Sequence, residues 1–337
     1  MKVLIYSSKI KDLEKSGVGK ASVHQMRALD LVGVPYTTDV NDDYDIVHIN
    51  TIFPDALIMA KKVKAKGKKV IFHAHSTEED FKNSFIFSNE IAPAFKQWLK
   101  ICYNQADLIL TPTPYSKKLL ENYGLKQNII SISNGIDLKL FNKTEDAAMR
   151  FRKKYGYKKD DKVIMAVGLY IERKGILEFL ELAKRMSDYK FIWFGYTDPA
   201  LVKLKVKMAM KEKTDNVIFP GYIPSEELKD AYAGADVYIF PTKEETEGIV
   251  VLEALAMRIN SIISDIPVYD DWLTDGYNVY KAKDVDEFEK KIKDLVEGRL
   301  PSVVDQGYKV AKERDIKKIG LELKKIYEKV LEKENVK

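Results

Sequence analysis

Two glutamates set eight positions apart are the residues whose type and spacing best indicate chemistry in this chain. Gly248 lies between Glu245 and Glu253, where the apolar run 237–240 gives way to the apolar segment 248–257. These segments predict a buried strand followed by a helix. The unpaired amides at the start of such a helix attract a phosphate, and carboxylates accept hydrogen bonds from vicinal hydroxyls. The junction therefore predicts a sugar-nucleotide site, with the phosphate held by the amides of Gly248, Ile249 and Val250.

Taken alone, the same segment fits a buried helix preceded by solvated acidic side chains equally well. A second charged cluster favours the sugar-nucleotide site over this alternative. Arg173 and Lys174 follow a strand that ends at Gly168. In a doubly wound sheet they would lie opposite the helix that starts at 248, where they could clamp a diphosphate and stabilise it as a leaving group. A solvated charge cluster is the alternative for these residues.

Strand ends in the first half of the chain carry further polar groups. His73 and His75 alternate along one strand, so only one imidazole is expected to face a cleft, and the end of a central strand favours His75. Gly17 and Gly19 follow the first strand in the turn 16–19, which is either a plain flexible turn or a loop whose backbone approaches a phosphate or sugar. The acidic residues 42–45 precede a strand as a turn, and we expect no metal site there.

The elements that must position these residues alternate between apolar strands and helical patterns. Such runs occur at 3–6, 46–49, 69–73, 108–111 and 129–133, and again, after a charged stretch at 143–162, at 163–168, 190–195, 216–221, 236–242 and 260–264. Strands this apolar predict parallel sheets covered on both faces, with ligands at their carboxyl ends. We therefore expect an α/β protein with two Rossmann-like, doubly wound domains facing a cleft. The expected domains are 1–140 and 141–313, and the helix 316–332, which has one apolar face, is expected to carry the segment 314–337 back onto the first domain.

Composition supports an ordinary globular protein. The chain has 337 residues, 45% of them hydrophobic and 32% charged, which is enough for two domains with separate cores. A single cysteine, Cys102, excludes an internal disulfide framework, and no apolar run is long enough for a signal peptide core or a spanning helix. We therefore expect a cytoplasmic protein. The net charge of +5 is mild and no nucleic-acid motif occurs, so nucleic acid is not an expected partner, and nothing predicts an oligomeric state.

Together these residues resemble the retaining glycosyltransferases of family 4, which have the two-lobed GT-B architecture. The resemblance covers nearly the whole chain and rests on the glycine turn at 16–19, His75, the segment 111–117, the segment 134–137, the segment 173–175 and the glutamate pair. It implies that Glu245 contacts donor-sugar hydroxyls, Glu253 holds the ribose, Arg173 and Lys174 take the phosphates, and His75 lies beside the transferred sugar, with Ser76 and Asn134 on the acceptor side. One position departs from the family pattern, because Leu169 stands where an arginine usually follows the strand-ending glycine.

A narrower resemblance is to glycolipid synthases that add a second hexose to monoglucosyl-diacylglycerol. It rests on the segments 75–85, 168–175, 244–255 and 265–269. It implies transfer of glucose or galactose from a UDP-sugar. No carboxylate stands out as a nucleophile in the first domain, so we expect a front-face substitution in which the leaving phosphate helps to take the acceptor's proton, and we expect no metal cofactor. Two alternatives stay open: a transferase for a soluble or polysaccharide acceptor, and a two-lobe sugar-binding module that performs no chemistry.

A basic and aromatic surface gives this second resemblance physical support. Six lysines fall within 61–69, five aromatic residues fall within 81–98, and a second lysine-rich stretch occupies 203–213. Each lysine near an anionic membrane contributes about 1 kcal/mol of attraction, so half a dozen could hold the protein there reversibly. We expect peripheral association with the inner face of the cell membrane. The alternative is a solvated lysine face with the aromatic residues in the core.

Overall fold

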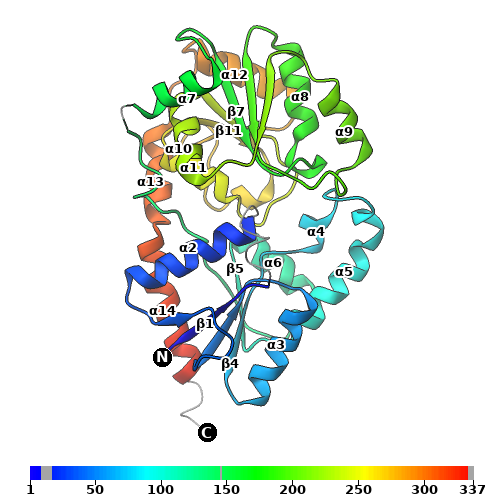
Figure 1. The fold of residues 1–337 in the computed structure, drawn as a ribbon, viewed down its shortest axis with the longest axis vertical. Helices are drawn as coiled ribbons and strands as arrows, with labels where there is room; N and C mark the ends of the chain where they lie inside the picture. Colours follow the sequence, from blue (N-terminus) through cyan, green and yellow to red (C-terminus); the bar gives the residue numbers. More distant parts are fainter. Residues whose placement is uncertain (9–16, 145, 333–337) are drawn as a thin grey trace. The chain divides into compact units, whose positions relative to one another are not determined.

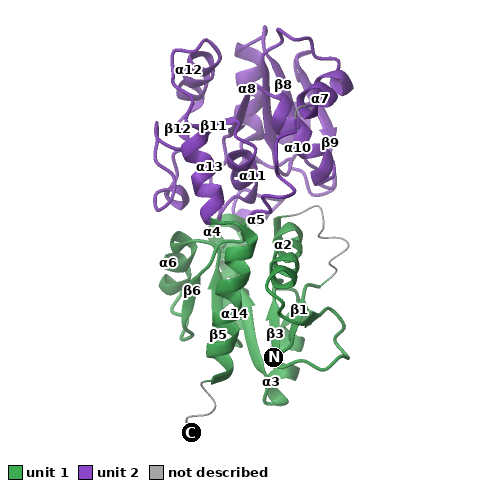
Figure 2. Ribbon diagram, turned by 90° about the vertical axis from the view of Figure 1, so that its left-hand side faces the viewer, with its two compact units in different colours: residues 1–81, 90–135, 314–337 green, residues 82–89, 136–313 purple. Residues whose placement is uncertain are grey.

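The computed structural model describes residues 1–8, 17–144 and 146–332, and the chain divides into two compact units. Unit 1 comprises residues 1–81, 90–135 and 314–337, and unit 2 comprises 82–89 and 136–313 (Figure 2). Each unit is built around its own six-stranded sheet, in which every strand pair is parallel. The predicted α/β class with two doubly wound sheets is confirmed. The sequence did not predict that the short segment 82–89 groups with unit 2.

The sheet of unit 1 has the strand order β2-β1-β3-β4-β5-β6. Its strands are β1 (Val3–Tyr6), β2 (Tyr36–Thr37), β3 (Ile46–Ile49), β4 (Lys69–His73), β5 (Leu108–Thr111) and β6 (Ile129–Ser131). Apolar side chains fill both faces of this sheet, as a parallel sheet covered by helices requires. Helices α3 (Pro54–Ala65), α5 (Ser88–Tyr103) and α6 (Pro114–Asn122) contribute to one core, and α2 (Gly17–Leu31) and α14 (Ile316–Glu332) to the other (Figure 1). The short helix α4 (Glu78–Phe81) follows β4.

Helix α14 returns to unit 1 and packs on α2, so the predicted crossing back is confirmed. Its apolar stripe, including Ile319, Leu323 and Ile326, is buried in the same core as β1. Burying one such side chain contributes roughly 1.5–3 kcal/mol relative to leaving it exposed. Gly320 permits the close approach, because a Cβ there would lie 2.3 Å from the carbonyl oxygen of Ala28.

The sheet of unit 2 has the order β12-β11-β10-β7-β8-β9. Its strands are β7 (Val163–Val167), β8 (Lys190–Phe194), β9 (Val217–Gly221), β10 (Val237–Phe240), β11 (Asn260–Ser264) and β12 (Tyr280–Ala282). The chain winds outward from β7 in one direction and from β10 in the other. The neighbours β7 and β10 therefore form the topological switch point, and ligands of such folds bind at the carboxyl ends of these strands.

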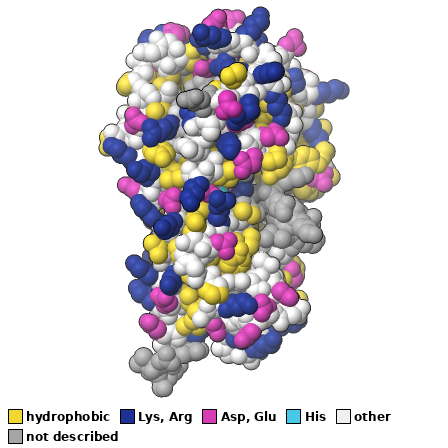
Figure 3. All heavy atoms as spheres, turned by 60° about the vertical axis from the view of Figure 1, so that its left-hand side comes forward, with side chains coloured by type: hydrophobic (Ala, Val, Ile, Leu, Met, Phe, Trp, Pro, Cys, Tyr) yellow, Lys and Arg dark blue, Asp and Glu magenta, His cyan; other side chains and the backbone are white. Residues whose placement is uncertain are grey.

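Nine helical segments connect or flank these strands in the described part of unit 2. They are α7 (Ala147–Tyr155), η1 (Glu172–Lys174), α8 (Ile176–Arg185), α9 (Leu204–Lys211), α10 (Ser225–Gly234), α11 (Ile249–Ala256), η2 (Pro267–Tyr269), α12 (Val285–Val296) and α13 (Val304–Glu313). Within the described ranges, no helix has the length and apolar character needed to cross a membrane. On the face drawn in Figure 3, basic, acidic and apolar side chains are intermixed.

Candidate functional site

Two loops meet at the carboxyl ends of β7 and β10 in unit 2. One runs from Gly168 to Gly175 and contains η1, and the other leads from β10 to α11. Lys174 on the first loop places its Nζ 2.5 Å from Oε1 of Glu245 on the second. The doubly wound topology thus brings together the cation cluster and the glutamate that the sequence singled out.

Gly175 makes this approach possible. Its φ of +81° lies in the left-handed region, and a Cβ there would lie 2.0 Å from the carbonyl oxygen of Pro241. A second close approach occurs at Gly195, where a Cβ would lie 1.8 Å from the carbonyl oxygen of Gly168. Because real Cβ atoms do not approach oxygen so closely, both positions require glycine. The two loops are therefore fixed by backbone contact before any side chain interaction is counted.

Arg173 is buried and ties three segments of unit 2 together. Its Nε donates to Oγ of Ser84 at 2.9 Å, and its Nη1 donates to the carbonyl of Glu244 at 2.8 Å. Its own carbonyl accepts from the backbone amide of Lys243 at 2.7 Å. The sequence predicted that Arg173 would serve the phosphates. In the structure the guanidinium bonds to a hydroxyl and a carbonyl that match its planar donors, and its role toward the phosphates stays a prediction.

The carboxylate of Glu245 is 5% exposed and held by neighbouring donors. Its Oε1 accepts from Lys174 and, at 2.7 Å, from Oγ1 of Thr242, and it lies 3.8 Å from Nη1 of Arg173. A buried carboxylate is stable when charged partners and hydrogen bonds surround it. The arrangement fixes the direction of this side chain and shares the charge of Lys174 between the carboxylate and any anion that enters.

Helix α11 begins at this site. Its N-cap residue, Gly248, has a φ of +86° and provides no side-chain hydrogen bond to the first turn. Gly248 has no side chain that could accept a hydrogen bond from the amides of Ile249 and Val250. The sequence predicted that these amides bind a phosphate. The hydroxyl of Tyr269 lies close by, 3.0 Å from where a Cβ of Gly248 would be.

Glu253 lies on α11 and is 1% exposed. Its Oε2 accepts from the hydroxyl of Tyr232 at 3.0 Å. Burial, together with the carboxylate of Glu253, raises the pKa of Tyr232 well above its ordinary value, so the phenol stays protonated and donates. The sequence predicted that Glu253 holds a ribose, and this contact with Tyr232 was not predicted.

Two more buried tyrosines near the glutamates escaped sequence reasoning. The hydroxyls of Tyr238 and Tyr269 have no hydrogen-bond partner among the described residues. Burial and neighbouring carboxylates, including Glu245 in both cases, raise the pKa of each phenol. Tyr269 ends the segment 265–269 that carries part of the resemblance to glycolipid synthases, and this was the available signal for it. Ser84 and Thr242 gave none, because hydroxyl residues in loops are common.

In unit 1, His75 is 8% exposed and follows the end of β4. The expectation that alternation would separate His73 from His75 is wrong. The amide of His75 donates to the carbonyl of His73 at 3.1 Å in a tight turn, and the two rings stack with centroids 4.2 Å apart. Residues two positions apart on a strand point to the same face, so the period of two itself places both imidazoles on one side. Burial lowers the pKa of His75 to about 3, and the imidazole is neutral at physiological pH.

The other predicted residues of unit 1 lie near strand ends. Gly17 and Gly19 belong to the first turn of α2, so the predicted turn is helical there, and Ser16 lies outside the described residues. Ser76 follows His75, and its carbonyl accepts from the hydroxyl of Tyr103 at 3.0 Å. Asn134 is buried beyond β6. The roles proposed for these four residues toward donor and acceptor stay predictions.

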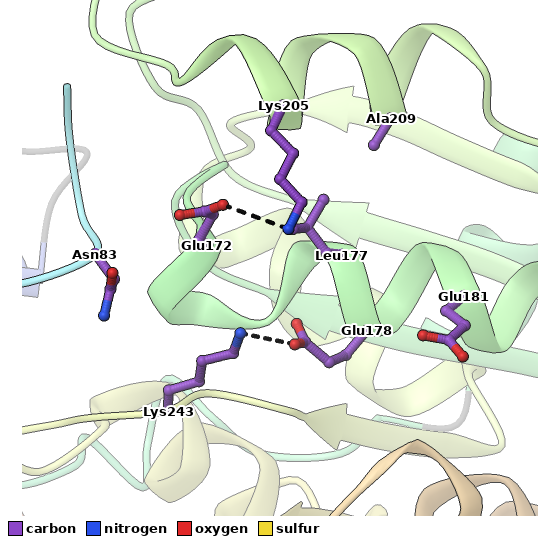
Figure 4. Close-up of a pocket in the computed structure, with 8 residues that line it drawn as sticks. All are labelled: Asn83, Glu172, Leu177, Glu178, Glu181, Lys205, Ala209 and Lys243. Atoms are coloured by element: carbon purple, nitrogen blue, oxygen red, sulfur yellow. Dashed lines mark ion pairs between the residues drawn. The ribbon is translucent and has the colours of Figure 1, made fainter.

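An open hollow of about 450 Å³ lies in unit 2 beside η1 and α8 (Figure 4). Glu172 faces Lys205 at 4.0 Å, and Glu178 pairs with Lys243 at 2.8 Å (Figure 4). Its charges are mixed and paired, which does not suit a diphosphate. In unit 1, the acidic turn at 42–45 is engaged by lysines: Lys2 pairs with Asp42 and Lys68 with Asp43. Among the residues that the structure describes, no group of three or more metal-binding side chains lies together.

Two family models match this chain. Glycosyltransferase Family 4 matches residues 33–140, and Glycosyl transferases group 1 matches residues 148–313. A protein of Acholeplasma laidlawii named processive diacylglycerol alpha-glucosyltransferase is 43% identical over 98% of this chain and 99% of its own length. An alpha-galactosylglucosyldiacylglycerol synthase of Streptococcus pneumoniae is 23% identical over 74% of this chain and 67% of its own.

Solved structures with the same fold have much lower sequence identity. HepE of Anabaena, crystallised with UDP and glucose, has a TM-score of 0.78 and is 15% identical, covering 98% of this chain and all 100% of its own. A sucrose-phosphate synthase of Thermosynechococcus elongatus has a TM-score of 0.75 at 16% identity, covering 98% of each chain. At such identities these structures establish the fold and nothing finer.

Proposed function

This chain belongs to the family 4 glycosyltransferases, and we propose that it transfers a hexose from a UDP-sugar to a glycolipid built on diacylglycerol, keeping the anomeric configuration. Its two doubly wound domains are those of the GT-B fold. The name of the Acholeplasma relative makes glucose the first donor sugar to test, and the resemblance to glycolipid synthases makes monoglucosyl-diacylglycerol the first acceptor. Because the chain belongs to a family of enzymes, the alternative of a sugar-binding module that performs no chemistry is excluded.

The observation that carries the donor site is the ion pair of Lys174 and Glu245 beside the start of α11. The amides of that helix start and the ammonium of Lys174 suit the diphosphate. Glu245, whose direction is set by Thr242, suits the neutral hydroxyls of the hexose. In this proposal Arg173 keeps the loop 242–245 in place and serves the phosphates, while Glu253, on α11, binds the ribose.

The proposed reaction needs no resident metal ion. Negative charge grows on the leaving UDP as the glycosidic bond breaks, and Lys174 with the helix amides would stabilise it. The acceptor hydroxyl attacks from the face that UDP leaves, and the departing phosphate takes its proton, so configuration is retained. His75, with Ser76 and Asn134 on the acceptor side, is proposed to contact the transferred sugar from unit 1.

A membrane surface on unit 1 is the second part of the proposal. The predicted aromatic surface needs revision, because Phe81 stacks on Phe95 with ring centroids 4.1 Å apart and Trp98 donates to the carbonyl of Ile52. Phe95 and Trp98 pack against the core, as the alternative interpretation held. Phe87, another of the five predicted aromatic residues, is 69% exposed. On α3 and α5 of unit 1, apolar exposure comes from isoleucines, namely Ile58, Ile91 and Ile101, which are 53%, 49% and 49% exposed.

Exposed lysines lie on the same side of the sheet. Lys61, Lys62 and Lys66 are exposed at the end of α3, which shares a core with α5. Apolar side chains that enter the interface and lysines that attract anionic lipid head groups together suit reversible binding. We therefore propose that unit 1 holds the enzyme peripherally on the inner face of the cell membrane, where its acceptor resides.

Product analysis tests the proposal. The protein is incubated with UDP-glucose, or UDP-galactose, and with liposomes that contain monoglucosyl-diacylglycerol, and the lipids are identified by mass spectrometry. A diglycosyl-diacylglycerol with an α linkage is the expected product. Release of UDP with transfer only to a soluble sugar or polysaccharide would favour the alternative acceptor class and refute the glycolipid assignment.

A further inference from the structure

Unit 1 contains a chain of hydrogen-bonded, buried side chains of which the reaction described above uses only His75. It links the proposed sugar-contacting histidine to the helix that crosses back. None of its members is more than 8% exposed; they are His75, Asn50, Gln25, Tyr327, His48 and His73. Buried polar groups are retained at a cost unless they are fully bonded, so a network of this size calls for an explanation.

The hydrogen bonds lead from His75, just after β4, to Tyr327 on α14, and return through His48 to His73 at the end of β4. Nε2 of His75 lies 3.0 Å from Oδ1 of Asn50, and Nδ2 of Asn50 lies 2.7 Å from Oε1 of Gln25. Nε2 of Gln25 contacts Nδ1 of His48 and lies 3.3 Å from the hydroxyl of Tyr327. That hydroxyl lies 2.7 Å from Nδ1 of His48, whose Nε2 lies 3.3 Å from Nδ1 of His73.

The direction of each bond follows from its neighbours. An amide oxygen only accepts, so Nε2 of His75 carries the proton that is shared with Asn50. Asn50 in turn donates to the oxygen of Gln25, which leaves the Gln25 nitrogen to donate toward Tyr327 and His48. Nδ1 of His48 is therefore an acceptor.

The protonated Nε2 of His48 then donates to Nδ1 of His73. All three imidazoles of the network thus have the same tautomer, with hydrogen on Nε2 and a lone pair on Nδ1. In the described part of the chain, Nδ1 of His75 makes no hydrogen bond.

We propose that Asn50, Gln25 and Tyr327 are positioning residues that hold His75 as a neutral hydrogen-bond acceptor, with Nδ1 available to a hydroxyl of the transferred sugar. This inference rests on the function proposed above. Burial supports it, because it lowers the pKa of His48 and His75 to about 3 and keeps the rings neutral. A neutral ring of fixed tautomer accepts a hydroxyl proton at one defined atom, which orients the sugar without donating a proton to it.

Tyr327 gives α14 a part in the site. Its hydroxyl is the only member of the network that comes from the C-terminal segment, and it can accept from Gln25 while donating to His48. Helix α14 would therefore set the tautomers as well as bury an apolar face. Without this hydroxyl, Gln25 and His48 would each lose a partner in a buried environment.

Nitrogen NMR on protein labelled in its histidines tests the tautomers directly. The chain has four histidines, and the fourth provides an internal reference. Nδ1 of His24 lies 2.9 Å from the carbonyl oxygen of Gly135, which only accepts, so His24 must carry its hydrogen on Nδ1. We expect one histidine with hydrogen on Nδ1 and three with hydrogen on Nε2. Hydrogen on Nδ1 of His75 would mean that the network runs in the reverse direction and would overturn the proposal.

Variants separate positioning from folding. In Asn50→Leu the ring of His75 should lose its single tautomer and exchange between both forms, and kcat with UDP-glucose should fall roughly tenfold, with a smaller change in KM for the donor. Tyr327→Phe is the milder variant, and it should alter the His48 resonances and lower kcat in the same direction. The matched control is Tyr157→Phe in unit 2, where the buried hydroxyl has no partner among the described residues. It should leave all four histidine spectra and kcat unchanged.

The outcomes distinguish this inference from the proposed function. If the wild-type protein transfers glucose and Asn50→Leu is equally active, the positioning role is refuted while the function stands. If the wild-type protein transfers no hexose to any glycolipid, the proposed function fails, and the role of the network in sugar transfer fails with it even when the three Nε2 tautomers are observed. Loss of activity together with loss of the single His75 tautomer supports the proposal.

Discussion

Nζ of Lys174 lies 2.5 Å from Oε1 of Glu245, so the cation proposed for the diphosphate and the carboxylate proposed for the hexose are partners before either meets the donor. Their side chains are 15% and 6% exposed. In such a setting, removal of one partner leaves an uncompensated charge, which typically costs 3–5 kcal/mol. When the donor binds, Lys174 and Glu245 would therefore exchange part of their contact with each other for contacts with the donor, and neither charge would have to be removed from water at that step.

This coupling predicts strong non-additivity. Glu245→Gln and Lys174→Met should each lower kcat/KM by roughly a hundredfold, because each removes one contact to the donor and disturbs the other. The double variant should be much less impaired than the product of the two effects. Steady-state kinetics on the four proteins measures the coupling. Simple multiplication of the two losses would show that the residues act independently.

Gly175 should be irreplaceable for a reason of shape. Gly175→Ala adds a Cβ that would lie 2.0 Å from the carbonyl of Pro241, and the loop must move to relieve the overlap. We expect a loss of more than about 2 kcal/mol in the free energy of unfolding, together with weaker UDP binding.

Gly156 provides the matched control for this variant. It also has a left-handed φ, +71°, but a Cβ there meets nothing within 4 Å. Gly156→Ala should therefore cost only about 1 kcal/mol, from backbone strain alone, and leave UDP binding intact. Equal losses in the two variants, measured by urea denaturation, would show that contact with Pro241 is unimportant.

Stability should fall with acid because of the stacked histidines. Burial lowers the pKa of His48 and His75 from 6.5 to about 3, and it also lowers that of His73. The unfolded chain therefore binds more protons than the folded chain below pH 6.5. The stabilisation is complete above that pH and is lost as the pH falls toward 3, at up to about 1.4 kcal/mol per pH unit for each histidine.

Denaturation curves recorded between pH 3 and pH 6.5 test whether the free energy of unfolding falls with acid and whether the histidines cause this fall. In His73→Gln the dependence of stability on pH should be shallower than in the wild-type protein, since one buried imidazole is removed. An unchanged slope would assign the acid sensitivity to carboxylates instead.

Binding to membranes should depend on the lysines of α3. Replacing Lys61, Lys62 and Lys66 with glutamate should abolish co-sedimentation with liposomes rich in anionic lipid, since each lysine contributes about 1 kcal/mol. The control replaces three exposed lysines of unit 2, Lys153, Lys158 and Lys159. Binding by the wild-type protein that ignores salt and anionic lipid would contradict the proposed surface, as would equal binding by both triple variants.

Chelation tests the absence of a metal requirement. With Lys174 and the amides of α11 as the proposed anion site, transfer should proceed undiminished in excess EDTA. A loss of activity that added magnesium or manganese restores would show that a metal ion shares the phosphate charge. Measurement of UDP release with and without the chelator decides the point.

The sequence predicted the long apolar strands well because their pattern is set by burial on both faces. The runs at 3–6, 46–49 and 69–73 coincide with β1, β3 and β4, and the helix 316–332 coincides with α14. The edge strands β2 and β12 were not predicted, since they have two and three residues and include polar side chains. Strands this short carry no periodic signal, and only pairing with a neighbour defines them.

At the site, sequence reasoning found the residues that share loops but missed their partners. Arg173, Lys174 and Glu245 were expected together because the doubly wound topology places the ends of β7 and β10 side by side. Their contacts with Ser84 and Thr242 depend on side-chain direction, which spacing does not reveal. The stacking of His73 on His75 was mispredicted because strand alternation separates adjacent residues, whereas residues two positions apart share a face.

The central claim is that UDP binds in unit 2 between the loop 168–175 and the start of α11. Isothermal titration of UDP into the wild-type protein, Lys174→Met and Lys243→Met tests it most directly, because Lys243 lies two residues from Glu245 but pairs with Glu178 in the hollow beside η1. We predict that Lys174→Met weakens UDP binding by roughly tenfold or more, while Lys243→Met binds like the wild-type protein. Unchanged affinity in Lys174→Met, or a loss confined to Lys243→Met, would contradict the claim.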